Sequence, residues 1–392
     1  MRFLDRNTAR YWLLNAAVAL VVWWLAPRSM AMAVLLFAVL WLCAMIFIDL
    51  AYYSGLFAFF DPEQTMSRGY NLSAEMNDTL HSAGLDYGFN FYDGDFGKSR
   101  ARAQTDKFEY AVRTIGITPG TRVMDVGCGC GDWLEYLVRV HGCTVMGINA
   151  SSAQVEQCRL RGLNVIGRNW KDVAGDAESM DRLRGSFDVV TFWDTVEHYV
   201  PASCRGDFAA QDAIYQSMFR FAQELLDPAS PQCRVWTSCL HMRVDMQHLP
   251  ASWLKVKKLA YLYLLDKYHS GFYPASNGDR DALVDNAGRL GYTLEHRRDV
   301  TRDYYMTSIL EPTHFGRHRF RLTARRLGIL LAMPLVDPFW WQRILWFAAE
   351  AWMLQFDVED IDRSDVILWW LIWRAPKSLG HRATCDTILA EV

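Results

Sequence analysis

The chain has 392 residues, which is enough for one large domain with appendages or for two domains. Half of the residues are apolar and 14% are aromatic, a composition that excludes general disorder. The formal net charge of −3 gives no indication of a nucleic-acid partner. The nine cysteines lack the spacing of a disulfide framework, so we expect free thiols in a reducing compartment. Cys128 and Cys130 are too close together in the sequence for a zinc knuckle, and no second pair of cysteines or histidines is present to complete a site. No metal site is therefore expected.

The first 60 residues predict a membrane hairpin. Residues 11–26 and 30–48 carry no charged side chain, and a Pro-Arg-Ser turn separates them. A spanning helix needs about 20 apolar residues, so the second run is long enough and the first is slightly short. A signal peptide fits poorly because the apolar run is doubled and no convincing cleavage site follows it. The alternative is a buried hydrophobic hairpin in a soluble protein.

The charges beside the two apolar runs predict their orientation. Arg2, Arg6 and Arg10 precede the first run, whereas the turn has only Arg28. Positive charge favours the cytoplasmic side, so we expect two N-terminal spans with the catalytic domain in the cytoplasm. The turn would then lie outside the cell membrane, or the pair would form a shallow re-entrant hairpin.

From residue 116 onward the pattern alternates between strands and helices. A helix at about 98–114 precedes this region, within a cap and cofactor-covering segment at residues 61–115. The alternation predicts a parallel, doubly wound α/β sheet with helices on both faces. The expected strands lie at 122–126, 143–148, 164–167, 187–193 and 234–240, and the expected helices at 131–141, 151–161 and 208–226.

The sheet domain is expected to span residues 116–312 and to be followed by a helical tail at 313–392. The tail begins with the arginine-rich stretch 314–328. Apolar runs follow, including VILWWLIW at 366–373. None of these runs reaches spanning length without a proline or a charge, so we expect amphipathic or core helices that cover the sheet domain.

The stretch VMDVGCGCGDW at residues 123–133 is the most informative motif. Asp125 ends an expected strand, and Gly127, Gly129 and Gly131 follow at alternate positions before the next helix. Glycines let the backbone turn sharply and approach a ligand closely. The spacing is neither that of a Walker phosphate loop nor the usual dinucleotide motif G-x-G-x-x-G.

In this setting the glycine loop resembles the first motif of class I S-adenosylmethionine-dependent methyltransferases. Most of these enzymes end the second strand with an acid that holds the ribose hydroxyls, but VMGINASSAQ has Asn149 there. The segment is similar to the cyclopropane fatty acid synthase family, which includes mycolic acid methyltransferases, and Ser151 and Gln154 match its pattern. RNWKD (168–172) resembles the family's Q-D-Y-R-D, which implies that Asn169 and Trp170 lie near the adenine. A core aromatic is an equally good interpretation of Trp170.

Three further segments resemble the same family. FDVVTFWDTVEHYV (187–200) matches its F-D-x-I-x-S-x-x-x-x-E-H-V-G pattern, with Glu197 and His198 in register. RDYYMTS (302–308) aligns with its H/D-Y-x-x-T-L pattern at Tyr304 and Thr307. NFYDGDFGKSRARAQTDKF matches an upstream segment at Tyr92, Gln104 and Lys107. The resemblance runs from about residue 85 to 375.

The resemblance implies a Rossmann-like sheet and S-adenosylmethionine as the methyl donor. It implies that Glu197 and Tyr304 are catalytic; an ion pair or helix cap is the structural alternative for Glu197. The implied cofactor-binding residues are Tyr92, Asp125, Gly127, Gly129, Gly131, Asn149, Ser151, Gln154, Asn169 and Trp170.

The chain departs from the family at its ion site. In cyclopropane synthases a bicarbonate ion beside the reaction centre is held by a cysteine, the glutamate, a histidine and the tyrosine. Here Gly94 stands at the cysteine position and Thr237 near the histidine position, while His241 lies four residues later. We therefore expect no bicarbonate cofactor, and Glu197 or Asp93 would take the substrate's proton, giving a branched methyl or methylene product in place of a cyclopropane.

The resemblance and the hairpin together predict a membrane-associated methyltransferase that acts on an unsaturated lipid acyl or sphingoid chain. Fungal sphingolipid C-methyltransferases are similar in placing two hydrophobic segments before a related catalytic domain. The expected partners are the bilayer and a membrane lipid. Two alternatives stay open: methylation of a small amphipathic amine, and a catalytically lapsed membrane scaffold.

Overall fold

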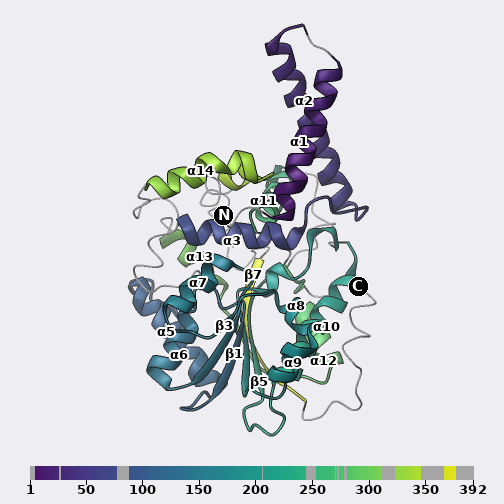
Figure 1. The fold of residues 1–392 in the computed structure, drawn as a ribbon. Helices are drawn as coiled ribbons and strands as arrows, with labels where there is room; N and C mark the ends of the chain where they lie inside the picture. Colours follow the sequence, from purple (N-terminus) through teal and green to yellow (C-terminus); the bar gives the residue numbers. More distant parts are fainter. Residues whose placement is uncertain are drawn as a thin grey trace.

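The structure is a computed structural model, and it describes residues 5–25, 28–76, 88–204, 206–243, 253–269, 271, 273–277, 280–310, 323–345 and 366–376. Its centre is a seven-stranded sheet with the strand order β3-β2-β1-β4-β5-β7-β6 (Figure 1). The strands are β1 (Arg122–Val126), β2 (Thr144–Ile148), β3 (Val165–Ile166), β4 (Val189–Trp193), β5 (Arg234–Met242), β6 (Thr293–Asp299) and β7 (Val366–Arg374).

The five strands from β3 to β5 are parallel, as the sequence predicts. The expectation of a wholly parallel sheet is wrong, because β7 pairs antiparallel with both β5 and β6. The expectation of a helix at 366–373 is also wrong, because these residues form the strand β7. An uninterrupted apolar run does not distinguish a buried strand from a buried helix by periodicity. Here the run lies in the sheet interior with Trp370 and Trp373 fully buried.

Helices cover both faces of the sheet, which confirms the doubly wound arrangement (Figure 1). One face carries α5 (Arg100–Ile115), α6 (Asp132–His141) and α7 (Ser152–Leu160). The other carries α8 (Trp170–Ala174), α9 (Ala177–Leu183), α10 (Phe208–Leu225) and α12 (Ala282–Arg289). Each face has its own apolar core, and both cores meet the central strands β4, β5 and β7.

The helix ends follow local sequence signals. Ser99 caps the start of α5 by accepting a hydrogen bond from the Arg102 amide, and Gly116 ends the helix in the left-handed conformation with φ 79°. Asp207 caps α10 in the same way through the Ala210 amide. These caps explain why the observed bounds of both helices lie close to the predicted ones.

Four helices lie over the carboxyl ends of the parallel strands (Figure 1). They are α3 (Pro62–Met76), α11 (Trp253–His269), α13 (Thr301–Leu310) and α14 (Ala324–Val336). The expected cap at 61–115 is thus represented by α3 and α5. Most of the expected tail at 313–392 lies outside the described residues.

Two further helices, α1 (Arg6–Trp24) and α2 (Met30–Tyr53), form a pair that projects away from the sheet domain (Figure 1). Among the described helices, α2 alone is long and apolar enough to cross a membrane by length and composition. Its apolar side chains are largely exposed, with Leu35 66% and Phe47 59% accessible. The described part of α1 does not reach that standard, so two spans are not shown. A single such helix near the N-terminus is weak evidence for a membrane span.

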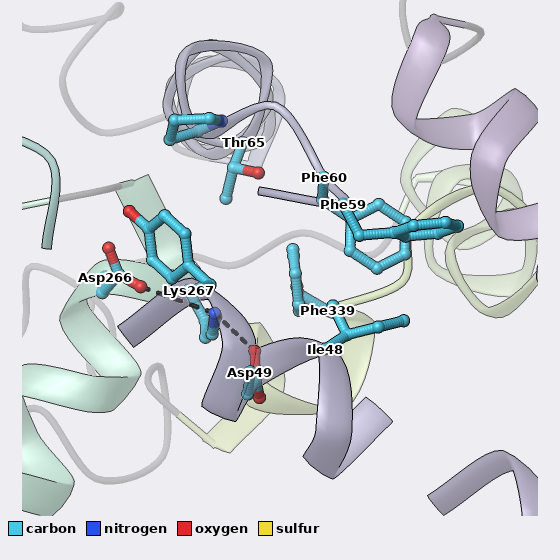
Figure 2. A pocket seen from close by; sticks show the side chains of 10 residues that line it. Ile48, Asp49, Phe59, Phe60, Thr65, Asp266, Lys267 and Phe339 are labelled. Carbon is cyan, nitrogen blue, oxygen red and sulfur yellow. Dashed lines mark ion pairs between the residues drawn. The ribbon is translucent and has the colours of Figure 1, made fainter. Parts of the chain in front are cut away.

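Buried charges fasten the base of this helix pair to the sheet domain. Lys267 on α11 forms ion pairs with Asp49 on α2, at 2.8 Å, and with its neighbour Asp266, at 3.5 Å (Figure 2). The ammonium also lies 4.7 Å from the centroid of the Phe339 ring. These residues line a partly open pocket of about 330 Å³ with Phe59 and Phe60.

A second buried ion pair, between Arg343 and Asp337 at 2.7 Å, lies near this pocket. A charge inside protein is costly unless paired, so these contacts hold the helix pair in one orientation.

Candidate active site

The glycine loop joins β1 to α6 at the carboxyl end of the sheet. Gly127, Gly129 and Gly131 have φ of 87°, 54° and 86°, a region that side chains disfavour. A Cβ at Gly127 would come within 2.4 Å of the Thr195 hydroxyl oxygen, and one at Gly131 within 2.5 Å of a Leu163 methyl carbon. A Cβ at Gly129 would meet no atom within 4 Å. The first and third glycines therefore serve packing, while Gly129 borders open space where a ligand could approach.

The predicted residues after β2 lie together at this loop. The Asn149 amide donates hydrogen bonds to the Gly129 carbonyl and to the Gln154 side-chain oxygen, both at 2.9 Å. Ser151 caps α7 by accepting from the Gln154 amide, and all three side chains are buried. Where most of these enzymes have an acid, Asn149 thus supplies an amide donor that hydrogen-bonds the backbone of the glycine loop. Asp125 is also buried and accepts a hydrogen bond from the Thr191 hydroxyl at 2.7 Å, so it ties β1 to β4.

Helix α3 covers this end of the sheet through contacts of three polar residues. The Asn71 side-chain oxygen accepts from the Ser151 hydroxyl at 2.9 Å and from the Ala153 amide at 3.0 Å. Ser67 donates to the Ala150 carbonyl at 3.1 Å. The Tyr70 hydroxyl lies 2.6 Å from Nε2 of His198.

Sequence reasoning missed these α3 residues. Ser67, Tyr70 and Asn71 recur at three- and four-residue spacing, which puts them on one helical face. That spacing is a signal for a shared face, but their residue types do not show what the face contacts. Only the tertiary structure brings them to the ends of β2 and β4.

Asn169 and Trp170 follow β3. Asn169 caps α8 by accepting a hydrogen bond from the Lys171 amide at 3.0 Å. The Trp170 ring is buried against Tyr199 and Phe221, with ring centroids 5.0 and 5.7 Å away. These contacts favour the core interpretation of Trp170.

Glu197 is the most unusual titratable group at this end of the sheet. It lies in a single 3-10 turn, η1 (Val196–His198), directly after β4, and is 3% exposed. One carboxyl oxygen accepts a hydrogen bond from the Leu240 amide at 2.7 Å. The other, Oε2, is buried with no hydrogen-bond partner among the described residues. Burial, and next the nearby Asp194 carboxylate, raise the pKa of Glu197 to about 8.

Asp194, which lies near Glu197, has an uncommon backbone conformation. Its φ is 47°, a left-handed value for a residue other than glycine. Its amide donates to the Ser238 carbonyl at 2.9 Å, and the Ser238 hydroxyl donates to its carboxylate. Strain of this kind at a strand end is typical of functional sites. A perturbed carboxyl beside a strained one at the carboxyl edge of an α/β sheet marks a candidate active site.

The remaining predicted residues lie on the α13 side. The Asp303 carboxylate accepts hydrogen bonds from the amides of Tyr92 and Asp93, at 2.6 and 2.9 Å, and so docks the 88–97 segment on α13. Tyr304 is buried against Phe89, with ring centroids 4.4 Å apart. It belongs to the same apolar core as Trp193 at the end of β4.

The residues near the positions of the family's bicarbonate site make other contacts in this protein. Thr237 is buried within β5, where its hydroxyl accepts a hydrogen bond from the Trp373 indole. His241 is buried with Nδ1 2.8 Å from the Cys239 carbonyl oxygen. Asp93 is half-exposed and pairs with Arg298. Asp93 therefore lacks the buried setting of a base for a lipid substrate, whereas Glu197 has it. The absence of a bicarbonate cofactor stays a prediction.

Comparison with known proteins identifies the family. The methyltransferase domain family matches residues 123–211, which contain both the glycine loop and Glu197. Cycloartenol-C-24-methyltransferase of Arabidopsis thaliana is 30% identical over 263 residues, which are 61% of this chain and 68% of the plant protein. The chain belongs to the S-adenosylmethionine-dependent methyltransferases.

Other relatives of this methyltransferase match over shorter stretches. Sterol 24-C-methyltransferase ERG6B of Gibberella zeae is 32% identical over 130 residues, so the chain spans 33% of that protein's length. Among solved structures, mycolic acid cyclopropane synthase CmaA1 complexed with SAH and CTAB has a TM-score of 0.57 at 14% identity. That similarity covers 79% of this chain and 97% of the synthase, and it shows the shared fold. The resemblance to class I methyltransferases is confirmed.

The residues present fit S-adenosylmethionine. Gly129 leaves open space above the loop, where an added Cβ would stand. Asn149 is bonded to the Gly129 carbonyl, and Gln154 and Ser151 are bonded in turn to Asn149 and to each other. Which atoms of the cofactor each residue contacts stays a prediction.

Proposed function

We propose that this methyltransferase is anchored in a membrane and transfers a methyl group to a carbon–carbon double bond of a lipid. The observation that carries the proposal is the buried carboxyl of Glu197 at the carboxyl end of the sheet, which has a raised pKa and one oxygen that no described residue hydrogen-bonds. The names of the sterol and cycloartenol 24-C-methyltransferases support methylation at carbon.

S-adenosylmethionine supplies an electrophilic methyl group when it is bound. An alkene carbon that bonds to a methyl group uses both π electrons, so the neighbouring carbon becomes a cation until a proton leaves. Such a cation needs a site from which water is excluded. Glu197 and Tyr304 are 3% and 4% exposed, which meets that requirement. Aromatic faces such as those of Tyr304 and Trp193 attract a cation.

Glu197 is the residue we assign to the proton. A cation nearby lowers the pKa of a buried carboxyl, so the substrate cation itself would favour the ionised form that accepts a proton. Loss of the proton from the added methyl group closes a cyclopropane, with the C–H electrons forming the new C–C bond. Loss from another carbon leaves an alkene in a methylated or methylene product. We propose that the second outcome prevails, because Gly94 and Thr237 stand where the family has the cysteine and the histidine that hold its ion, and the Thr237 hydroxyl is bonded to the Trp373 indole.

The position of the helix pair supports a lipid acceptor. α1 and α2 project from the same end of the molecule as the carboxyl ends of the parallel strands (Figure 1). A bilayer around α2 would therefore face the candidate active site. Anchoring with the catalytic domain on the cytoplasmic side is part of the proposal.

Lipid mass spectrometry tests the proposal. Cells expressing the full-length chain would be fed methionine with an isotopic methyl label, and their lipids extracted. We expect an unsaturated acyl, sphingoid or sterol species to gain one labelled methylene unit, and cells expressing Glu197→Gln to lack it. A label found on an amine nitrogen would favour the amine alternative. Absence of cofactor binding by calorimetry would favour a lapsed scaffold.

A further inference from the structure

Helix α14 has its amphipathic character reversed. A helix on a soluble domain turns its apolar side inward and its charges outward. In α14 the leucines at 327, 331 and 335, which follow one another at four-residue spacing, are 43%, 68% and 67% exposed. Arg326 on the inner side is 6% exposed and donates a hydrogen bond to the Glu75 carbonyl at 3.1 Å. The exposed side of α14 therefore carries a leucine stripe, and its one strongly exposed charged residue among those described, Arg325 in the first turn, is paired with Glu75 at 2.7 Å.

Contacts with α1 fix the position of this leucine stripe relative to the helix pair. The C-terminal end of α14 accepts three hydrogen bonds from α1 at its backbone carbonyls. Thr8 donates to Val336 at 2.9 Å, Tyr11 to Pro334 at 3.2 Å, and Trp12 to Leu335 at 2.7 Å. Figure 1 shows α14 lying across the top of the sheet domain, crosswise to the projecting helices. A membrane plane perpendicular to the helix pair would thus run along α14.

The length of the helix pair also indicates that α14 lies within the membrane interface. From Trp12, which contacts α14, to Trp24 the rise is about 18 Å at 1.5 Å per residue. The hydrocarbon core of a bilayer is about 30 Å thick. If the bilayer began above α14, the exposed indoles of Trp23 and Trp24 and the charge of Arg28 would stop inside the hydrocarbon. Sinking α14 into the interface by about 5–10 Å carries these residues toward the far interface, which tryptophan and arginine favour.

We propose that α14 is an interfacial helix whose leucine stripe is immersed in the lipid bilayer. The inference rests on the proposed membrane anchoring and adds to it a defined depth for the catalytic domain. The helix pair and α14 together would hold the carboxyl end of the sheet at the bilayer surface. A lipid acceptor could then reach the candidate active site without leaving the membrane completely. The occupant of the leucine stripe is phospholipid; another part of the chain or a second copy would be the competing occupant.

Depth-resolved fluorescence quenching on the full-length chain tests this. An environment-sensitive fluorescent amino acid would replace Leu331 on α14, Leu35 on α2 or Leu160 on α7, one at a time. Leu160 is a matched control, because it is 76% exposed and ends α7, at the end of that helix away from the Ser151 cap that contacts α3. The protein would be reconstituted in phosphatidylcholine vesicles that carry nitroxide quenchers either near the headgroup or deep in the acyl chain.

We expect the shallow quencher to act on the probe at 331, the deep quencher on the probe at 35, and neither on the probe at 160. Quenching at 35 without quenching at 331 would overturn the interfacial helix while leaving the anchor in place. A blue-shifted probe at 331 that lipid quenchers do not reach would also overturn it, by showing that protein covers the leucine stripe. No quenching at 35 would overturn the membrane anchoring and this inference together.

A second variant links the leucine stripe to catalysis. Replacing Leu327, Leu331 and Leu335 together by glutamine puts polar side chains at exposed positions, so the fold should persist. We expect a several-fold higher apparent KM for lipid presented in vesicles, with cofactor affinity unchanged, because less apolar surface holds the domain at the interface. Leu160→Gln should behave like the parent. An unchanged KM in the triple variant would contradict the proposal.

Discussion

Glu197 is the side chain to which we assign the proton transfer in the proposed reaction. It is buried after β4, one of its oxygens accepts from the Leu240 amide, and the other has no hydrogen-bond partner within the part of the chain that the structure describes. Leaving a buried polar atom unpaired costs free energy, so such an atom calls for a functional explanation. The structural alternative, an ion pair or a helix cap, is not what these contacts show.

Replacing Glu197 by glutamine should reduce turnover much more than cofactor affinity. Glutamine keeps the shape and can still accept from the Leu240 amide, but it cannot take a proton. Groups that transfer protons typically contribute about 10²–10⁴-fold, and a loss of that order is expected. Turnover per folded molecule and cofactor affinity by calorimetry would be measured in parallel. Bicarbonate should restore little activity to the parent enzyme; strong dependence on bicarbonate would show that Gly94 and Thr237 were misaligned.

The raised pKa of Glu197 also makes a prediction about stability. In the unfolded chain this carboxyl has its ordinary pKa of 4.5, and in the folded protein burial raises the pKa to about 8. Folding therefore favours the protonated form. Its contribution to stability should be complete below about pH 4.5 and should be lost as the pH rises to about 8. Melting temperatures measured across this window should fall less with pH in Glu197→Gln than in the parent.

The three glycines of the cofactor loop should respond differently to substitution. Valine at position 129 would meet no protein atom but would occupy the open space above the loop, so cofactor affinity should fall sharply. Because φ is 54°, some loss of stability is also expected. Alanine at Gly131 would press against Leu163 and should mainly lower the melting temperature. Normal cofactor affinity in Gly129→Val would show that the cofactor lies elsewhere.

At the scale of elements, α3 is what turns an open sheet edge into an enclosed site. Asn71 satisfies the Ser151 hydroxyl and the Ala153 amide at the start of α7, beside the predicted cofactor-binding residues. Asn71→Ala would leave both donors without this acceptor, at a cost of about 1–3 kcal/mol for each buried group left unsatisfied. We expect a lower melting temperature and weaker cofactor binding by calorimetry. Asn164→Ala, at an exposed position after α7, is the control and should change neither.

β7 shows how an element far along the chain completes the sheet. It inserts between β5 and β6, and its indoles donate into β5: Trp370 to the Ser238 hydroxyl and Trp373 to the Thr237 hydroxyl, at 3.1 and 3.2 Å. Ser238 in turn holds Asp194, which acts on Glu197. The segment expected to be a covering helix is therefore linked to the candidate catalytic carboxyl through Ser238 and Asp194.

At the scale of the whole molecule, the projecting helix pair decides where the enzyme works. If α2 crosses a bilayer, the full-length chain should stay in the membrane pellet after a high-salt wash that removes peripheral proteins. Detergent should release it. Release by salt alone would indicate that the exposed apolar surface of α2 packs against protein.

The sequence by itself determined the central part of this protein. The glycine loop and the alternation from β1 to β5 follow from local patterns, because turn, cap and periodicity signals act over a few residues. Glu197 was singled out by the resemblance of residues 187–200 to a family pattern. The same resemblance implied that Asn149, Ser151 and Gln154 belong to the cofactor site, and the structure connects Asn149 to both the Gly129 carbonyl and Gln154. Only the tertiary structure decided that residues 366–374 form a strand, that α3 closes the site through Asn71, and that Lys267 fastens the helix pair. These features depend on partners 80 to 220 residues away, and no local pattern specifies which distant donor or apolar face a segment will meet.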